Sequence, residues 1–253
     1  MKSKDAYNWC DLQFPFPYLE KDDLNRAVFR FISFDYLLQM INESSNYLVK
    51  TSLWEDSYEN FMSKENIKYR GKTVNLKGIT DRMYGQCWTS RMTSDALWRI
   101  YSPDKKGVRI RTTLNKLNLV VEENRARGAF QLGRVRYYSQ GVMEESLRSL
   151  PEISKTQLVE LINRSYFVKR TSFSHESEYR LLYFADKRET DTVVKSFQID
   201  PYSFIDNIYF DPRADKSYVD RCTKILVDAF SFPESRIYKS QLYSFKPLDI
   251  KVV

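Results

Sequence analysis

Short apolar runs interrupted by charged residues recur along the chain, and their spacing predicts both strands and helices. Period-two alternation predicts strands over residues 27–32, 47–50, 84–90, 107–113, 133–138, 178–184, 193–199 and 205–210. Apolar positions three and four apart predict helices over residues 34–42, 94–101, 113–124, 155–167 and 216–230. Strands interleave with helices but follow closely on one another after Glu178. We therefore predict an α+β fold with flanking helices and a mixed, largely antiparallel sheet.

No Pro-, Gly- or Ser-rich linker and no internal repeat divides the 253 residues, so we predict a single globular domain over 1–253. The stretch 1–25 is rich in aromatics and prolines and predicts an irregular arm packed on this domain. Residues 186–191 predict a polar connector between strands. No apolar run approaches the roughly 18 residues of a membrane span. The first residues lack the apolar core of a secretory signal, so we expect a cytoplasmic protein without membrane partners.

Cysteine and histidine usage narrows the chemistry. The three cysteines, Cys10, Cys87 and Cys222, are widely spaced, and His175 is the only histidine. We therefore expect neither a disulfide scaffold nor a metal site, and at most one histidine dyad. Because a single histidine limits such dyads, any catalysis is expected to use carboxylates. The glycine-rich motifs of Rossmann and P-loop sites are missing from the sequence, which argues against both kinds of site.

Positive charge is concentrated in the middle of the chain. The formal net charge is +7, and residues 64–136 carry 17 Lys/Arg against 6 Asp/Glu. Such a basic region can bind nucleic-acid phosphates, and neighbouring tyrosines can stack on bases. The candidate nucleic-acid-binding residues are Arg109, Arg111, Arg134, Arg136 and Tyr137. The alternative is a solvated strand face whose apolar residues turn inward.

The most informative short segment contains Glu176, Glu178 and Arg180. If a strand begins near Glu176, the two carboxylates lie on one face. Two acids so placed suit a reaction in which positive charge develops at a glycosidic carbon. The alternative is a solvent-facing ladder of charged residues at the start of a strand.

Three further residues are candidates for ligand contacts. Trp98 and Tyr101 share one face of a predicted helix and could stack on a ring, although aromatics at this spacing also form cores. We expect Trp98, deeper in the helix, to be the structural member of the pair. Arg30, among apolar neighbours, either extends to solvent at an edge or grips an anion.

The order of these segments resembles a bacterial and phage family of unknown function. The resemblance runs from about Phe29 to Phe210. Its motifs, in chain order, are Phe-Arg-Phe-x-Ser from Phe29, Ser-Leu-Trp-Glu-Asp from Ser52, Cys-Trp-Thr-Ser from Cys87, Leu-Trp-x-x-Tyr with Gly-Val-x-Ile from Leu97 to Ile110, Val-x-Tyr from Val135 and Glu-x-Glu-Tyr-Arg from Glu176.

A more distant resemblance is to the arginine-class ADP-ribosyltransferases, in which an early-strand arginine, a serine motif and a Glu-x-Glu pair follow in this order. It implies that Arg30 grips a phosphate or ribose of NAD and that Ser90 buttresses the acid. It further implies that Glu178 holds the ribose 2′-hydroxyl and stabilises the oxocarbenium ion, while Glu176 activates the acceptor. Of the serine-threonine-serine motif, only Thr89-Ser90 is present.

The first hypothesis is therefore an ADP-ribosyltransferase-like or NAD-cleaving enzyme that uses NAD as its substrate and needs no metal. Its target would be nucleic acid or protein. Its setting would be bacterial or phage, for example as a toxin or in phage defence. Its candidate catalytic residues are Glu178, Glu176 and Ser90, and its candidate NAD-binding residues are Arg30, Tyr101 and Trp98. The alternatives are a non-catalytic nucleic-acid-binding module and a structural or interaction protein. The sequence leaves the acceptor and the oligomeric state open.

Overall fold

The computed structural model describes residues 10, 19, 21–56, 58–59, 67–69, 72–74, 76–186 and 192–245, with only the backbone described at 67–69 and 72–74. Most of the predicted arm 1–25 and residues 187–191 of the predicted connector lie outside this range. The chain divides into two compact units. Unit 1 comprises Met1–Val28, Asn46–Ser90 and Thr113–Ile199, and unit 2 comprises Phe29–Ser45, Arg91–Thr112 and Asp200–Val253. The single-domain organisation stays a prediction.

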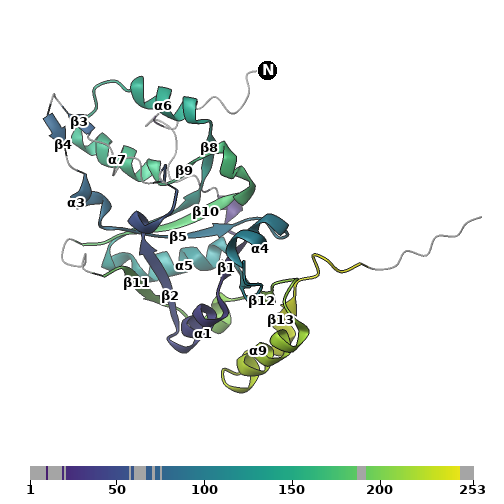
Figure 1. Cartoon of the computed structure of the whole chain (residues 1–253). Coiled ribbons are helices and arrows are strands. Elements are labelled where there is room, and N and C mark those ends of the chain that lie inside the picture. The colour runs from purple at the N-terminus through teal and green to yellow at the C-terminus, as the bar shows by residue number, and fades with distance from the viewer. Residues whose placement is uncertain are drawn as a thin grey trace, which may run out of the picture. The chain divides into compact units, whose positions relative to one another are not determined.

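Helices and strands alternate along the described residues (Figure 1). The strands are β1 (Ala27–Ile32), β2 (Ser45–Lys50), β3 (Ile67–Tyr69), β4 (Lys72–Val74), β5 (Met83–Thr89), β6 (Val108–Thr113), β7 (Ala129–Arg134), β8 (Arg136–Tyr138), β9 (Val168–Arg170), β10 (Glu178–Phe184), β11 (Val194–Gln198), β12 (Asn207–Phe210) and β13 (Ile237–Lys239). The α-helices are α1 (Phe34–Asn42), α3 (Lys77–Thr80), α4 (Asp95–Tyr101), α5 (Leu114–Asn124), α6 (Gln140–Arg148), α7 (Lys155–Ser165), α8 (Pro201–Phe204) and α9 (Lys216–Asp228). The 3₁₀ helices are η1 (Lys21–Asp23), η2 (Thr51–Leu53), η3 (Arg125–Arg127), η4 (Thr171–Glu176) and η6 (Glu234–Arg236).

The strands of unit 1 are hydrogen-bonded in the order β11-β2-β5-β10-β7, with β5, β10 and β7 antiparallel to their neighbours. Two short pairs accompany them, the antiparallel β3-β4 and the parallel β8-β9. In unit 2, β6 pairs antiparallel with β12, and β12 pairs parallel with β13. The predicted α+β class with a mixed, largely antiparallel sheet is thus confirmed.

The elements with the clearest sequence patterns have the bounds that the sequence predicts. Strands 27–32 and 178–184 and helix 34–42 have the predicted bounds. Helix α1 begins where the Ser33 hydroxyl accepts the N–H of Tyr36 at 3.1 Å, which satisfies a donor that the helix itself leaves unpaired. The predicted strand 133–138 is instead two strands. The N–H of Val135 still donates to the carbonyl of Glu178, opposite it in the register of β7 and β10, at 2.9 Å, whereas the N–H of Arg136 donates to the carbonyl of Phe167 at 2.8 Å, where the pairing with β9 begins.

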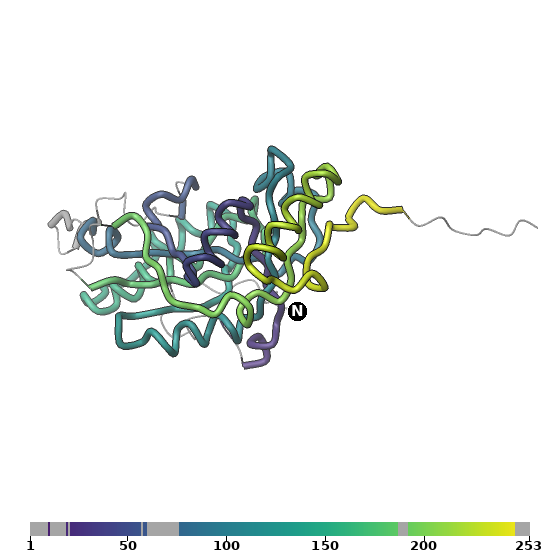
Figure 2. Tube along the Cα trace, turned by 90° about the horizontal axis from the view of Figure 1, so that it is seen from below, coloured from purple at the N-terminus to yellow at the C-terminus, as the bar shows by residue number. Residues whose placement is uncertain are grey.

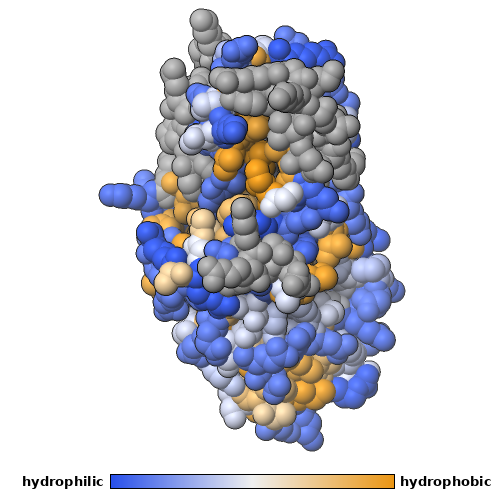
Figure 3. Space-filling view, turned by 90° about the vertical axis from the view of Figure 1, so that its left-hand side faces the viewer, coloured by the Kyte–Doolittle hydropathy of each residue, from blue (hydrophilic) through white to orange (hydrophobic). Residues whose placement is uncertain are grey.

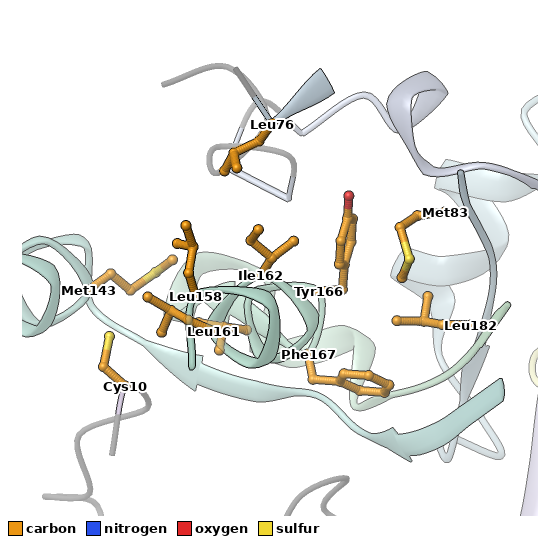
Figure 4. Packing of buried hydrophobic residues seen from close by; sticks show 11 residues of the cluster. Cys10, Leu76, Met83, Met143, Leu158, Leu161, Ile162, Tyr166, Phe167 and Leu182 are labelled. Atoms are coloured by element: carbon orange, nitrogen blue, oxygen red, sulfur yellow. The ribbon is translucent and has the colours of Figure 1, made fainter. Parts of the chain in front are cut away.

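The apolar core of unit 1 forms between α7 and the strands β5 and β10. Helix α7 begins at a capping box formed by Ser154 and Gln157. Figure 4 shows its side chains beside Met83 of β5 and Leu182 of β10. The buried members of this core are Cys10, Leu76, Met83, Met143, Leu158, Leu161, Ile162, Tyr166, Phe167, Val168 and Leu182. Residues 178, 180 and 182 share one face of β10, because strand side chains alternate. The face that carries Glu178 and Arg180 therefore continues directly into this core.

The described surface carries mainly hydrophilic residues on the face shown in Figure 3, where hydrophobic residues form smaller groups. Figure 2 traces the same chain from below, with α9 and the described residues after it towards the yellow end of the colour scale. Among the described residues, no helix is long and apolar enough to cross a membrane.

Candidate functional site

Five charged side chains of unit 1 converge in its interior. They are Glu59, Lys169 of β9, Glu176 at the end of η4, and Glu178 and Arg180 of β10. We call this set the charge cluster. Its members are between 0% and 6% exposed, so the cluster is shielded from water. Ionised groups are stable in such surroundings only when they are paired and hydrogen-bonded.

Lys169 lies at the centre of the carboxylates. Its Nζ lies 2.5 Å from Oε2 of Glu176, 3.0 Å from Oε1 of Glu59 and 3.3 Å from Oε1 of Glu178. Opposite charges at these distances hold the ammonium group charged, and its pKa is raised although burial alone would lower it. One lysine thus joins all three acids.

Arg180 joins two of the same acids from the other side. Its Nη2 lies 2.7 Å from Oε2 of Glu178 and also donates to Oε1 of Glu59. Its Nη1 donates to the main-chain carbonyl of Tyr166 at 2.6 Å. Trp54 covers the guanidinium, with 4.5 Å between Cζ and the ring centroid. Arg180 is therefore fixed from several sides and holds Glu178 in one orientation.

Gly85 of β5 makes room for this indole ring. A Cβ atom at Gly85 would lie 2.5 Å from the Trp54 ring and 2.9 Å from Leu182. Any side chain there would force the ring away from Arg180. The glycine is thus part of what holds the guanidinium in place.

A tight turn brings the two glutamates together. Ser177, between them, adopts the left-handed conformation with φ of 47°. Strand β10 begins only at Glu178, so Glu176 and Glu178 converge through a turn rather than through the strand alternation considered from sequence. Left-handed backbone is strained for residues other than glycine and persists where its surroundings fix it.

Hydroxyl groups at the end of β5 fix this turn. Oγ1 of Thr89 donates to the carbonyl of Glu176 at 2.5 Å, and Oγ of Ser90 donates to the carbonyl of Ser177 at 3.2 Å. The N–H of Ser90 also donates to the carbonyl of Ser177, at 3.1 Å. Thr89 and Ser90 therefore brace the backbone that carries both acids.

The two carboxyl groups have opposite pKa shifts. Burial, followed by the neighbouring Glu178, raises the pKa of Glu176 to about 7. Burial also acts to raise the pKa of Glu178, but Arg180 and Lys169 outweigh it and hold that pKa below its ordinary value. The lowered pKa keeps Glu178 ionised at neutral pH, while the raised pKa of Glu176 leaves part of this group protonated there. Paired titratable groups with separated pKa values are typical of acid and base roles.

Tyr137 of β8 links the predicted nucleic-acid-binding strand to the cluster. Its hydroxyl oxygen accepts the N–H of Glu178 at 2.8 Å. Burial raises the pKa of this phenol, which therefore stays protonated. Arg134 and Arg136 are exposed, at the end of β7 and the start of β8. Two of the predicted arginines are therefore sequence neighbours of a residue that contacts Glu178.

Five of the predicted residues belong to unit 2: Arg30, Trp98, Tyr101, Arg109 and Arg111. That Arg30 and Tyr101 act together with Glu178 stays a prediction. Trp98 is fully buried, while Tyr101 is 46% exposed. The roles assigned to the two aromatics stay predictions. Phe31 stacks on Tyr101 with centroids 6.0 Å apart.

The two unit 2 arginines of β6 differ in their surroundings. Arg109 is 3% exposed, and its guanidinium lies 4.7 Å from the Phe29 ring and 4.4 Å from the Tyr209 ring. Burial lowers its pKa to about 10. Arg111 remains 40% exposed at its side chain and lies 4.0 Å from Asp206. Of the two, Arg111 has the side chain that solvent reaches.

Sequence reasoning did not identify Lys169 or Glu59, which complete the cluster. Glu59 contacts Arg180 across 121 positions of the chain, a separation that no local pattern reveals. Lys169 lies in a three-residue strand, too short for a periodic signal. Among the described residues, no three His, Cys, Asp or Glu side chains are arranged to hold a metal ion.

The raised pKa of Glu176 predicts a specific dependence of stability on pH. Between about pH 4.5 and about pH 7 the folded protein keeps a proton that the unfolded chain releases. This contribution to the free energy of unfolding is complete below pH 4.5 and is lost as the pH rises through 7. Urea unfolding across this window should show stability falling more steeply for the wild type than for Glu176→Gln, which cannot titrate. Parallel curves for the two proteins would contradict the assignment.

Comparison with known proteins identifies one sequence family. Residues 97–181 match the family described as "Protein of unknown function (DUF2971)". The resemblance to a family of unknown function is thereby confirmed for the part of the chain that holds the Leu97 and Glu176 motifs. No curated protein matches the sequence.

Solved structures of DarT from Thermus sp. 2.9 are similar to this chain at low identity. The complex with ADP-ribosylated ssDNA has 13% identity and a TM-score of 0.39, with 86% of this chain and 95% of that chain covered. The complex with NAD+ has 14% identity and a TM-score of 0.39, with coverage of 88% and 98%. The complex with carba-NAD+ has 14% identity and a TM-score of 0.38, with coverage of 90% and 98%.

Proposed function

We propose that this chain cleaves the bond between nicotinamide and ribose in NAD and transfers ADP-ribose to an acceptor. The observation that carries the proposal is the pair of carboxyl groups on one braced turn, one ionised and one with a pKa of about 7. Reactions at a glycosidic carbon use two acids in different protonation states.

We assign to Glu178 the role of stabilising the positive charge that develops on the ribose. Cleavage of the glycosidic bond leaves positive charge on the ribose, and an ionised carboxylate beside it lowers the barrier. Arg180 and Lys169 keep Glu178 ionised and fix its orientation, with Oε2 lying 2.7 Å from Nη2 of Arg180. The same carboxylate can accept a hydrogen bond from the ribose 2′-hydroxyl.

Glu176 is assigned the role of base towards the acceptor. A new bond forms between the acceptor atom and the ribose carbon, nicotinamide departs with the electron pair of the broken bond, and the acceptor's proton passes to Glu176. Only the ionised form of Glu176 can take this proton. A pKa of about 7 makes that form available near neutral pH.

Burial of the pair favours this chemistry and also restricts access. Glu176 is 6% and Glu178 4% exposed, so competing water is largely excluded and electrostatic interactions are strong. A nucleotide can reach the carboxylates only after neighbouring side chains move aside. We assign Ser90 to bracing the turn rather than to contact with the substrate, because its hydroxyl donates to the Ser177 carbonyl.

The proposed acceptor is a nucleic acid bound by Arg134 and Arg136. Both side chains are exposed, and Tyr137, next in sequence, hydrogen-bonds to Glu178. Arginines at such positions neutralise phosphates. A strand of nucleic acid held there would run past the element whose Tyr137 contacts the main chain of Glu178.

Loss of charge at Glu178 should abolish the reaction. We predict that Glu178→Gln lowers nicotinamide release from labelled NAD by about 100-fold or more, because the amide keeps the shape and removes the negative charge. Nicotinamide is measured with purified protein, with and without single-stranded DNA or RNA. The matched control is Glu160→Gln, which removes a carboxylate 2.7 Å from buried Arg164 outside the cluster.

The control should retain wild-type turnover. Equal rates for the wild type and Glu178→Gln would refute the role of Glu178. A wild type that releases no nicotinamide but binds nucleic acid would favour the non-catalytic binding module.

The exposed arginines should account for part of the salt dependence of binding. For Arg134→Ala with Arg136→Ala, the slope of log affinity for single-stranded DNA against log salt should decrease by about 1.4, as for two lost phosphate contacts. The control double variant, Arg125→Ala with Arg148→Ala, removes two exposed arginines that pair with Glu122 and Glu144. Equal slopes for both double variants would show that Arg134 and Arg136 contact no phosphates.

A further inference from the structure

Glu59 is the one acid of the charge cluster that lies outside the Glu-x-Glu turn. Its Oε1 contacts both Nη2 of Arg180 and, at 3.0 Å, Nζ of Lys169. The residue is 6% exposed, and its N–H donates to the carbonyl of Asp56 at 3.0 Å. Oε1 of Glu59 thus binds Lys169 and Arg180, the two cations that also form the ion pairs with Glu176 and Glu178.

The cluster has more acids than bases. Glu59, Glu176 and Glu178 face Lys169 and Arg180, so full ionisation would leave one unbalanced negative charge in the interior. An unbalanced buried charge is costly, and a group in this situation takes up a proton instead. One bound proton makes the cluster neutral.

Among the residues that the structure describes, the titratable groups beside the cluster do not supply the balance. Cys87 of β5 is partly buried, and desolvation raises the pKa of its thiol; Tyr137 of β8 likewise has a raised pKa, so both are neutral. Arg170 of β9 has its own partner, Asp56, at 2.8 Å. The proton therefore belongs to one of the three carboxylates.

The three acids differ in their ion pairs with the two cations of the described cluster. Glu178 contacts both Lys169 and Arg180, and Glu59 does the same. The ion pairs of the described cluster give Glu176 contact with Lys169, at 2.5 Å. A carboxylate with less compensation from positive charge is the first to be protonated.

We propose that Glu59 is a positioning residue that controls the protonation of Glu176: its carboxylate engages Lys169 and Arg180 and thereby makes the cluster retain one proton. Without this acid, two carboxylates and two cations balance, and Glu176 no longer needs a proton. The consequence for activity rests on the proposed function, since it concerns the base that accepts the acceptor's proton. The protonation itself is independent of any reaction.

The test is a pH titration of glutamate carboxyl groups by NMR in protein labelled with ¹³C at that carbon. Glu176→Gln identifies the signal of Glu176 by its disappearance. In Glu59→Gln the midpoint of this signal should move down by about one to two pH units, the size expected when a nearby like charge is removed. Glu160→Gln, which removes a carboxylate paired with a buried arginine elsewhere in unit 1, should leave the midpoint unchanged.

A second variant covers the case in which Glu59→Gln does not fold. Glu59→Asp keeps the charge but withdraws it from Lys169 and Arg180 by one methylene, so a smaller downward shift is expected. An unchanged midpoint in the folded variant would overturn the inference.

Activity separates this inference from the proposed function. If NAD is cleaved, the pH at which turnover rises should move down together with the NMR midpoint in Glu59→Gln. A shifted midpoint in a protein that releases no nicotinamide would support the role of Glu59 and refute the proposed reaction. NAD cleavage by the wild type, together with an unshifted Glu176 midpoint in Glu59→Gln, would support the proposed reaction and refute the role of Glu59.

Discussion

The interaction on which the site depends is the sharing of two cations by three buried carboxylates. If Lys169 and Arg180 left the cluster, the carboxylates of Glu59 and Glu178 would remain in the interior as unpaired charges, which is costly. The surrounding structure holds both cations in place: Trp54 covers Arg180, the Tyr166 carbonyl accepts its Nη1, and Lys169 is fixed by its strand. The orientation of Glu178 follows from these contacts.

Stability alone does not explain this arrangement. Buried ion pairs contribute little net stability, because desolvation offsets most of the attraction between the charges, and well-packed apolar residues often serve better. The turn adds a further cost, since Ser177 adopts left-handed backbone. Strained backbone beside carboxyl groups with separated pKa values supports the proposal that the cluster acts on a substrate.

Local patterns in the sequence predict much of the fold. The alternation in 178–184 and the helical spacing in 34–42 are dictated by which side chains are buried, and these elements have the predicted bounds. Shorter elements escape such patterns: β9 has three residues and α3 has four. The predicted strand 133–138 divides because the main chain changes partner between Val135, whose N–H donates to the carbonyl of Glu178, and Arg136, whose N–H donates to the carbonyl of Phe167. Both partners are distant in the sequence.

The candidate site was only partly predictable for the same reason. Glu176, Glu178 and Ser90 are recognisable from residue type and order along the chain. The partners that set their charges are not, because Glu59 and Lys169 reach the cluster through tertiary packing alone. The sequence predicted that Glu176 and Glu178 lie on the same face of a strand. Instead, the left-handed Ser177 brings them together, and the hydroxyl groups of Thr89 and Ser90 hold this turn.

The location of one proton tests this account most directly. Neutron diffraction from crystals of the deuterated protein, grown below about pH 7 where the raised pKa favours the protonated form, would reveal it. The account predicts a deuteron on a carboxyl oxygen of Glu176, none on Glu178, and a fully protonated Lys169. A deuteron on Glu178, or none on any of the three carboxyl groups, would contradict it.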